Sequence, residues 1–175
     1  ISNANFATII GTNGSSISTT EHLMAALLGL GIDNIFIEVG GPEIPILDGS
    51  ASEFVTALME TGIKTLPADK EFVEVSEPIN VHAEDRWVSI YPYDGLKITF
   101  STDYPHPLIR QQSLSLDITP ESFSKEIAYA RTFGFKKDID HFYSLGLAQG
   151  GSLDNAVVLD DKVVLNPSGL RVKDE

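Results

Sequence analysis

The most regular apolar pattern in the chain lies at residues 23–30. Its four apolar residues recur at the i, i+3, i+4, i+7 spacing of one helix face: Leu23, Ala26, Leu27 and Leu30. Ser18 and Glu21 precede this run with the spacing of a capping box, in which the Ser18 hydroxyl accepts a hydrogen bond from the Glu21 N–H. Gly29 and Gly31 indicate where the helix ends. The pattern predicts an amphipathic helix that opens with Glu21 and His22.

The residues on both sides of this helix predict short strands and a packed loop. Residues 7–10 favour a short strand, and the residues that follow, 11–16, are rich in turn formers. Residues 35–39 are β-rich and continuous enough for an inner strand. Residues 40–50 contain two prolines with apolar residues between them, which indicates a loop packed against the protein.

Three further helices are expected from spacing and cap residues. Ser50 or Ser52 is expected to cap a helix that runs through Met59 and that Gly62 ends. A third helix has Thr119 as its N-cap and proline at its first position, and its expected buried face is formed by Phe123, Ile127 and Ala130. A fourth helix is expected over residues 137–145, before Gly146.

Between the second and third helices the pattern changes to strands. Strands are predicted at residues 71–75, 79–82, 86–93, 96–104 and 113–118, with Asp94 and Gly95 as a hairpin turn, and two short ones at 156–159 and 162–165. Helices grouped apart from antiparallel strands indicate the α+β class. We expect two similar layered subdomains, each a mostly antiparallel sheet packed with helices: residues 1–66, of which the sheet is incomplete, and residues 67–175.

Composition narrows the classes of partner. Hydrophobic residues make up 42% of the 175, enough for a core, and the longest apolar run, residues 23–32, is too short to span a bilayer. A net charge of −13 without a basic patch argues against nucleic acid and against an anionic membrane surface. We therefore expect no stable membrane insertion. Because the chain has no cysteine, any metal site must use nitrogen and oxygen ligands.

The Glu21–His22 pair is the first candidate for chemistry. The positive end of a helix disfavours an imidazolium and favours the neutral imidazole, which is the form that binds metal. The spacing alone does not distinguish this reading from an idle pair on a helix, and the capping box explains Ser18 and Glu21 without any function.

Four longer motifs occur in register along the chain. They are residues 18–23 (STTEHL), 29–34 (GLGIDN), 42–50 (PEIPILDGS) and 130–135 (ARTFGF). Together they resemble the UDP-3-O-acyl-N-acetylglucosamine deacetylase (LpxC) family, the zinc amidases of lipid A synthesis. The resemblance covers nearly all of the chain from Ser18 onward, and four motifs in order are far more specific than one.

The resemblance implies roles for three of these residues. It makes His22 a ligand of Zn²⁺ and Glu21 the general base, which removes a proton from the water that attacks the acetamide. It makes Thr132 the residue whose hydroxyl stabilises the tetrahedral oxyanion. The alternative for Thr132 is an ordinary hydroxyl at a helix end that bonds back to a carbonyl.

The resemblance also implies contacts with the substrate, UDP-3-O-acyl-N-acetylglucosamine. Tyr104 would stack on the uracil base, Asp103 would accept a hydrogen bond from it, and Arg86 would bind the diphosphate. The expected apolar passage for the acyl chain is lined by Phe133, Phe135, Ile139, Gly151, Ala156 and Val158. Asp48 would orient a group near the metal without touching the ion. The plain alternatives are a strand-end turn, a solvated arginine, ordinary core residues and an Asp-Gly turn.

One departure from the family concerns the metal ligands. A catalytic zinc site needs about three protein ligands and an open position, and His22 is the one ligand that the motifs assign. In the family the other ligands, a His and an Asp, and a general-acid histidine would follow Glu175, and His82, His106 and His141 do not fit that pattern. We therefore expect an internal fragment that also lacks N-terminal strands and is inactive alone.

A rival reading is a catalytically silent paralogue, or a module on the same fold that binds the UDP-sugar or a protein partner. The presence of Glu21, His22 and Thr132 argues against it, and the encoded residues after Glu175 would distinguish the two. The resemblance further implies a monomer in the cytoplasm of a Gram-negative bacterium, with plant organelles as the alternative.

Overall fold

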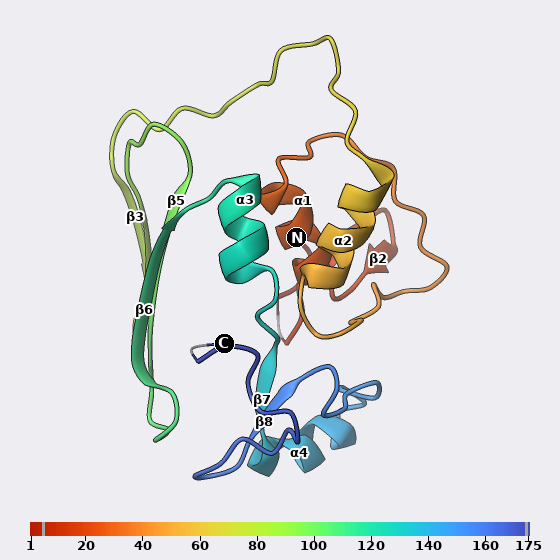
Figure 1. Ribbon diagram of the computed structural model, residues 1–175, viewed down its shortest axis with the longest axis vertical. Helices are drawn as coiled ribbons and strands as arrows, with labels where there is room; N and C mark the ends of the chain where they lie inside the picture. The colour runs from red at the N-terminus through yellow and green to blue at the C-terminus, as the bar shows by residue number, and fades with distance from the viewer. Residues whose placement is uncertain (5, 174) are drawn as a thin grey trace.

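The computed structural model describes residues 1–4, 6–173 and 175, and these residues form short helices and strands (Figure 1). The strands are β1 (Ile10–Thr12), β2 (Ser15–Ile17), β3 (Ile79–Ala83), β4 (Arg86–Ile90), β5 (Lys97–Tyr104), β6 (Arg110–Asp117), β7 (Phe133–Phe135) and β8 (Val157–Leu159). The α-helices are α1 (Glu21–Gly29), α2 (Ser52–Thr61), α3 (Pro120–Ser122) and α4 (Ile139–Ser144). A π-helix, η1 (Phe123–Ile127), continues α3, and a 3-10 turn, η2 (Lys136–Asp138), precedes α4.

The strands pair two by two within the described residues. β1–β2, β3–β4 and β5–β6 are antiparallel pairs, whereas β7 and β8 run parallel, with Phe133 opposite Val157 and Phe135 opposite Leu159. Small sheets and separate helices confirm the α+β class. The division at residues 66 and 67 into two similar subdomains stays a prediction.

The core joins α1, α2 and the α3–η1 segment, which lie together in Figure 1. Its buried apolar side chains are Ala26, Leu30, Ala51, Val55, Phe123 and Ala128. The apolar spacing predicted for α1 is confirmed, because Ala26, Leu27 and Leu30 are all buried. Phe54 and Leu58 of α2 pack against the same core. This core therefore packs α1 against α2 and the α3–η1 segment.

Glycines end α1 and α2 as the sequence predicts. Gly31 has φ +70°, its N–H donates to Leu28 O, and the Ile32 N–H donates to Leu27 O, which is the Schellman arrangement. Gly62 ends α2 with φ +80°. The expected N-cap of the third helix is also confirmed: Thr119 accepts from Ser122 N–H in a capping box, with proline at the first helical position.

The capping box predicted at Ser18 is wrong. The N-cap of α1 is Thr20, whose side chain makes no capping hydrogen bond. The Ser18 hydroxyl lies 3.1 Å from that of Thr19, which has φ +57°, and the Glu21 carboxylate accepts instead from the Thr8 N–H. The bend at Thr19 takes Ser18 out of capping position. Neither Ser50 nor Ser52 is the N-cap of α2, because Ala51 takes that position without a side-chain bond.

Three predicted strands do not form. Residues 35–39 and 71–75 have no regular structure and are mostly exposed, with Phe36 and Val73 at 103% and 95% exposure. Residues 162–165 contribute one isolated bridge, Val164 to Leu159. β-propensity reflects the fit of a side chain to a sheet, and within the described chain no strand pairs with 35–39 or 71–75.

The structure has a hairpin where the sequence predicted a turn-rich loop, and it lacks the hairpin that the sequence predicted at Asp94 and Gly95. Asn13 and Gly14, with φ +52° and +81°, form the tight turn between β1 and β2. The strand expected at residues 7–10 begins later than predicted, at Ile10. Asp94 and Gly95 do not close a hairpin, because β4 pairs with β3 and β5 pairs with β6. The antiparallel strand region is therefore two hairpins.

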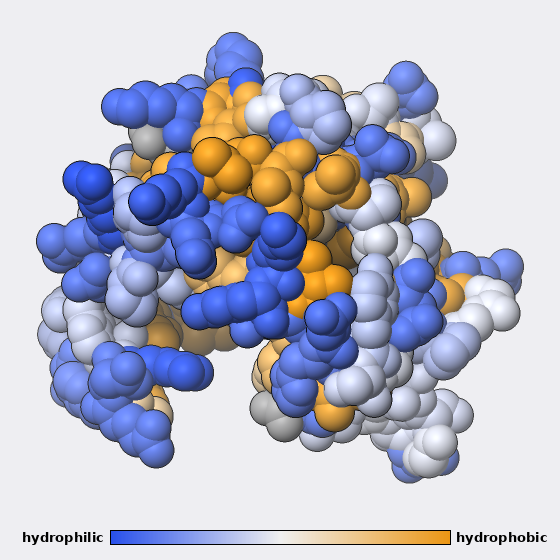
Figure 2. Space-filling view, turned by 90° about the horizontal axis from the view of Figure 1, so that it is seen from below, coloured by the Kyte–Doolittle hydropathy of each residue, from blue (hydrophilic) through white to orange (hydrophobic). Residues whose placement is uncertain are grey.

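The two hairpins expose apolar side chains. On β5–β6 one face carries the hydroxyl pairs Thr99–Ser115 and Ser101–Ser113, at 2.7 and 2.8 Å, and the other carries apolar pairs such as Phe100–Leu114. Phe100 is 66% exposed. Figure 2 shows one face of the molecule on which hydrophobic side chains gather near the centre, with hydrophilic ones around them. Among the described residues, no helix has the length and apolar character needed to cross a membrane.

Replacing Gly29 with alanine should destabilise the protein. A Cβ at Gly29 would lie 2.2 Å from Phe123 Cδ1, so the core must shift. Overpacking costs about 1–3 kcal/mol, against which the better helix propensity of alanine returns up to about 1 kcal/mol. We expect the free energy of unfolding in urea to fall by about 1–2 kcal/mol. Gly40→Ala is the control, since a Cβ there meets nothing within 4 Å; equal stability of both variants would contradict the packing argument.

Candidate functional site

The start of α1 places Glu21 and His22 in the first turn of the helix. Thr8 anchors this turn: its carbonyl accepts from the Thr20 N–H at 3.3 Å and from the Thr20 hydroxyl at 3.1 Å, and its N–H donates to Glu21 Oε2 at 2.9 Å. The Glu21 carboxylate is therefore fixed by backbone on a neighbouring segment, and the pair keeps a defined orientation.

His22 has an environment that favours the neutral imidazole. The side chain is half-buried, and burial lowers the pKa of His22, while the negative charges of Glu21 and Asp48 oppose that shift. Burial is the stronger effect, so the ring stays uncharged and keeps a nitrogen lone pair available near neutral pH.

A loop over residues 40–50 is tied to the same end of α1. The Ser18 N–H donates to Pro42 O at 2.9 Å, the Ile44 N–H donates to Ser18 O at 3.1 Å, and the Thr19 hydroxyl donates to Glu43 Oε1 at 2.6 Å. Ile44 is 5% exposed, which confirms that the loop packs against the protein. A groove of about 360 Å³ lies between this loop, Leu23 and Phe54.

Asp48 lies at the end of this loop inside a ring of donors. Its carboxylate accepts from the Ser50 N–H and from the hydroxyls of Ser50 and Ser52, and it pairs with Arg171 at 2.9 Å. Burial would raise the pKa of Asp48, but the hydrogen bonds from Ser50, Ser52 and Arg171 lower it overall. Asp48 is thus a fixed negative charge that acts electrostatically on His22. Its hydrogen bond from the Ser50 N–H also forms the Asp-Gly turn that was the plain alternative for this residue.

Thr132 joins this loop to the β7–β8 pair. Its N–H donates to Gly49 O, and its carbonyl accepts from the Val157 N–H, both at 2.8 Å. Gly49 has φ +82°, and a Cβ there would lie 1.8 Å from Asn155 O, so this position requires glycine. Thr132 is exposed, and within the described contacts its hydroxyl does not bond back to a helix carbonyl. The helix-end alternative therefore lacks support.

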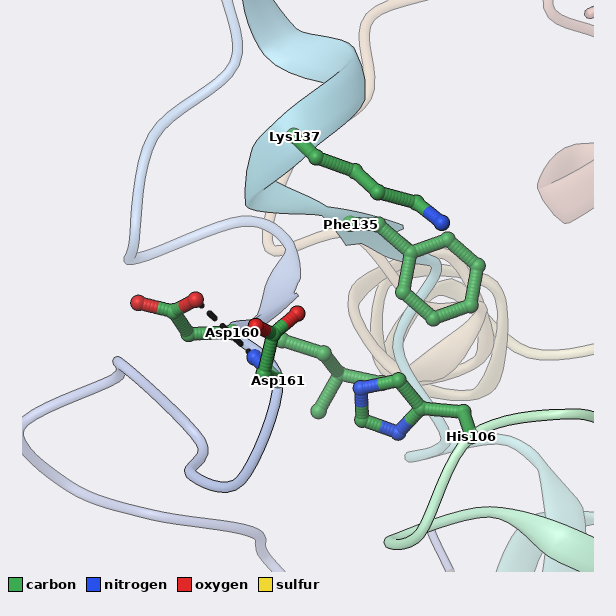
Figure 3. Close-up of a pocket in the computed structure, with 6 residues that line it drawn as sticks. His106, Phe135, Lys137, Asp160 and Asp161 are labelled. Atoms are coloured by element: carbon green, nitrogen blue, oxygen red, sulfur yellow. Dashed lines mark hydrogen bonds between the residues drawn. The ribbon is translucent and has the colours of Figure 1, made fainter.

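Aromatic side chains from three elements meet beyond Thr132. The Tyr104 ring packs edge-on against Phe133 at 5.6 Å and lies 6.2 Å from Phe135, and His106 lies 5.2 Å from Phe135. Figure 3 shows His106 and Phe135 on one side of a small pocket of about 30 Å³, with Lys137 along the Phe135 ring and Asp160 and Asp161 opposite. An apolar surface and a set of charged groups are thus brought together at the end of β5.

The other predicted contact residues are distributed more widely. Ile139 begins α4, and Ala156 and Val158 lie at β8; all three side chains are half-buried. Asp103 is exposed on β5, and a Cβ at Gly151 would lie 3.1 Å from Ala148 O. The Arg86 side chain is 90% exposed and lies 3.8 Å from its neighbour Asp85, with no described contact to the aromatic cluster. The solvated-arginine alternative describes Arg86 as it stands.

Two arginines that the motifs did not single out connect these parts. The Arg131 Nε donates to Glu175 Oε1 at 2.6 Å in a pair whose side chains are 4% and 0% exposed, and its Nη2 donates to Gly169 O. Arg171 binds Asp48, Ser50 and the carbonyl of Tyr129. Arg131 stands in a quoted motif, but no local pattern distinguishes Arg171, because its partners are distant in sequence.

The donors for a metal ion are incomplete. His22 is a half-buried nitrogen donor, and the Asp48 carboxylate acts on it. Within residues 1–4, 6–173 and 175, however, no group of three or more His, Cys, Asp or Glu side chains is placed to hold an ion. A three-ligand zinc site is therefore not assembled by the described residues alone.

Comparison with known proteins resolves the family. The LpxC family, described as UDP-3-O-acyl N-acetylglycosamine deacetylase, matches the chain over residues 1–175. The chain belongs to the LpxC family. It is 50% identical over 169 residues to the UDP-3-O-acyl-N-acetylglucosamine deacetylase of Nitratidesulfovibrio vulgaris, covering 97% of this chain and 54% of that protein. It is 51% identical over 169 residues to the enzyme of the same name from Histophilus somni, covering 95% and 55%.

This LpxC-family chain spans about half the length of the curated relatives it matches. Within that half, the structure brings His22, Asp48 and Thr132 into one connected region and places the aromatic cluster beside it. The assigned roles of these residues stay predictions.

Protonation of the Asp48 carboxylate at low pH should lower the free energy of unfolding of the LpxC-family chain. A carboxyl whose pKa is lower in the folded than in the unfolded state stabilises the fold above its unfolded pKa, and that contribution is lost as the pH falls through the folded pKa. Between about pH 5 and pH 3, the free energy of unfolding should fall less steeply in Asp48→Asn than in the native chain. Urea unfolding over a pH series measures this, and parallel curves would show that Asp48 is not responsible.

Breaking the buried Arg131–Glu175 pair should cost much more than breaking an exposed pair. Arg131→Met leaves a buried carboxylate without its partner, for which we expect a loss of about 3–5 kcal/mol in the free energy of unfolding. The control is Lys136→Met, which removes an ion pair whose side chains are 58% and 37% exposed and should change stability by less than about 1 kcal/mol. Similar losses in the two variants would refute the distinction.

Proposed function

We propose that the protein containing this chain hydrolyses the acetamide of UDP-3-O-acyl-N-acetylglucosamine to a free amine and acetate in lipid A biosynthesis. The observation that carries the proposal is the connection of three elements, the Glu21–His22 turn, the Asp48 loop and Thr132, in a chain about half identical to proteins that bear this name. The proposal includes a cytoplasmic location in a Gram-negative bacterium and a monomeric state.

Zn²⁺ is the proposed cofactor, and when bound it supplies Lewis-acid chemistry that polarises the amide carbonyl and makes water more acidic. His22 is the proposed ligand from this chain, since its imidazole is kept neutral by burial. The remaining ligands would have to come from outside the described residues, because no three-donor group exists among these. Asp48 would hold the orientation of the imidazole through its fixed charge.

The side chains of the chain have separate tasks in the proposed reaction. Glu21 accepts a proton from the attacking water, and the Thr8 N–H keeps its carboxylate in place. Thr132 donates its hydroxyl proton in a hydrogen bond to the oxygen of the acetamide carbonyl as negative charge develops there. The water oxygen forms a bond to the carbonyl carbon, the C–N bond then breaks, the nitrogen takes up the proton that Glu21 accepted and leaves as an amine, and the carbonyl carbon leaves as acetate.

The aromatic cluster is the proposed binding surface for the rest of the substrate. Phe133, the first residue of β7, follows Thr132 directly and is 43% exposed, so an apolar chain could lie along it toward Ile139 and Val158. Tyr104 and Asp103 at the end of β5 are the proposed uracil contacts, and Arg86 the proposed diphosphate contact. Of these, Tyr104 has the strongest structural support, because it packs directly on Phe133.

The proposal is tested by assaying acetate release from UDP-3-O-acyl-N-acetylglucosamine, for the 175-residue chain and for the gene product that contains it. We expect zinc-dependent activity in the gene product and none in the chain alone. Glu21→Gln should lower kcat about 10²–10⁴-fold, and Thr132→Ala about 10²–10³-fold. His22→Ala should lose bound zinc by metal analysis.

Lys64→Met, on an exposed residue, is the control and should retain activity. Binding of the UDP-sugar without hydrolysis would contradict the proposal and support a binding module. Full activity and stoichiometric zinc in the isolated chain would contradict the expectation that ligands lie outside it.

A further inference from the structure

The Arg171 side chain contacts three residues on two segments that are far apart in the sequence. Its Nη2 lies 2.9 Å from Asp48 Oδ2, and its Nη1 donates to Ser50 Oγ at 3.2 Å and to Tyr129 O at 2.8 Å. Its own backbone N–H donates to Glu175 Oε2 at 2.6 Å. The guanidinium therefore links the Asp48 loop to the segment that enters β7, although Arg171 itself lies 121 positions after Ser50 in the sequence.

The link is partly shielded from water. The side chains of Arg171 and Asp48 are 32% and 17% exposed, whereas the pair Lys125–Glu121 has 68% and 75% exposure. Shielded charge pairs with several hydrogen bonds hold their geometry better than solvated pairs, which contribute little. A lysine could pair with Asp48 as a point charge, but it lacks the planar fork that reaches Asp48 and the Tyr129 carbonyl at once.

The two linked segments are the ones that carry the proposed chemistry. Asp48 stands at one end of the loop beside Gly49, whose carbonyl accepts from the Thr132 N–H, and Tyr129 stands three residues before Thr132. Arg131, between them, is held by Glu175, which also binds the Arg171 backbone. The separation of Asp48 and Thr132 is therefore fixed from both sides by one network of arginines.

We propose that Arg171 is a positioning residue for the hydrolysis, one that sets the separation between the Asp48 loop and Thr132 by binding the Asp48 carboxylate and the Tyr129 carbonyl at the same time. This inference rests on the proposed function. Arg171 touches neither the water nor the acetamide in this scheme; it acts through Asp48 and through the backbone before Thr132. Small displacements of reacting groups cost up to about 10²-fold in rate, so the effect belongs in kcat.

The first test is a double-mutant cycle on the gene product that contains this chain. Arg171→Met and Asp48→Asn should each lower kcat about 10–100-fold with KM changed less than about threefold, and the double variant should be no slower than the slower single variant. Arg171→Lys should restore only part of kcat, because it lacks the second contact. Lys125→Met is the control and should leave kcat unchanged. Native kcat in Arg171→Met, or multiplied effects in the double variant, would overturn the proposal.

The second test needs no activity and uses the gene product that contains this chain. Hydrogen exchange at the Thr132 N–H, which donates to Gly49 O, reports whether the two segments stay together. We expect exchange at this amide to become at least tenfold faster in Arg171→Met, while amides of α2 such as Val55 keep their rates. Unchanged exchange at Thr132 would overturn the positioning role. If the native gene product proves inactive, the proposed function fails, and this exchange measurement still decides whether Arg171 holds the Asp48 loop against the segment that enters β7.

Discussion

The loop from Asp48 to Ser50 is the constraint on which the arrangement of the candidate site depends. The Gly49 carbonyl accepts a hydrogen bond from the Thr132 N–H. The Gly49 Cα lies so close to the Asn155 carbonyl that no side chain fits at position 49. Asp48 on one side of it collects hydroxyl, amide and guanidinium donors and acts electrostatically on His22. Because a glycine makes this close approach, the Asp48 carboxylate and the backbone of Thr132, the two residues to which we assign roles in the proposed reaction, lie on either side of Gly49 in one contact network.

The surroundings of this turn divide into a polar and an apolar part. The polar part runs from Thr8 and Glu21 through Asp48 to the two buried or half-buried arginine contacts. The apolar part begins at Phe133 and continues into the ring contacts with Tyr104 and Phe135. Such a division suits the proposed substrate, which carries a hydrolysable acetamide and an acyl chain on the same sugar.

Local patterns predicted the features whose forces are local. The buried face of α1, the glycine ends of α1 and α2 and the Thr119 cap depend on neighbours within a few residues, and all were predicted correctly. The strand expected at residues 35–39 failed because a strand depends on a partner that the pattern does not contain. The capping box predicted at Ser18 does not form, because Thr19 has a positive φ and the Glu21 carboxylate accepts a hydrogen bond from the Thr8 N–H instead. Arg171 had no local signal, since its partners lie far away in the chain.

The hydrophobic core that α1, α2 and the α3–η1 segment share has a consequence for proteolytic cleavage of the chain. Ala26, Ala51, Phe123 and Ala128 interlock across a connector, residues 63–78, that has no regular structure and is almost entirely exposed. A protease that cuts this connector should therefore yield two fragments that remain associated under native conditions, since the cut breaks a covalent link but none of the contacts among these four side chains.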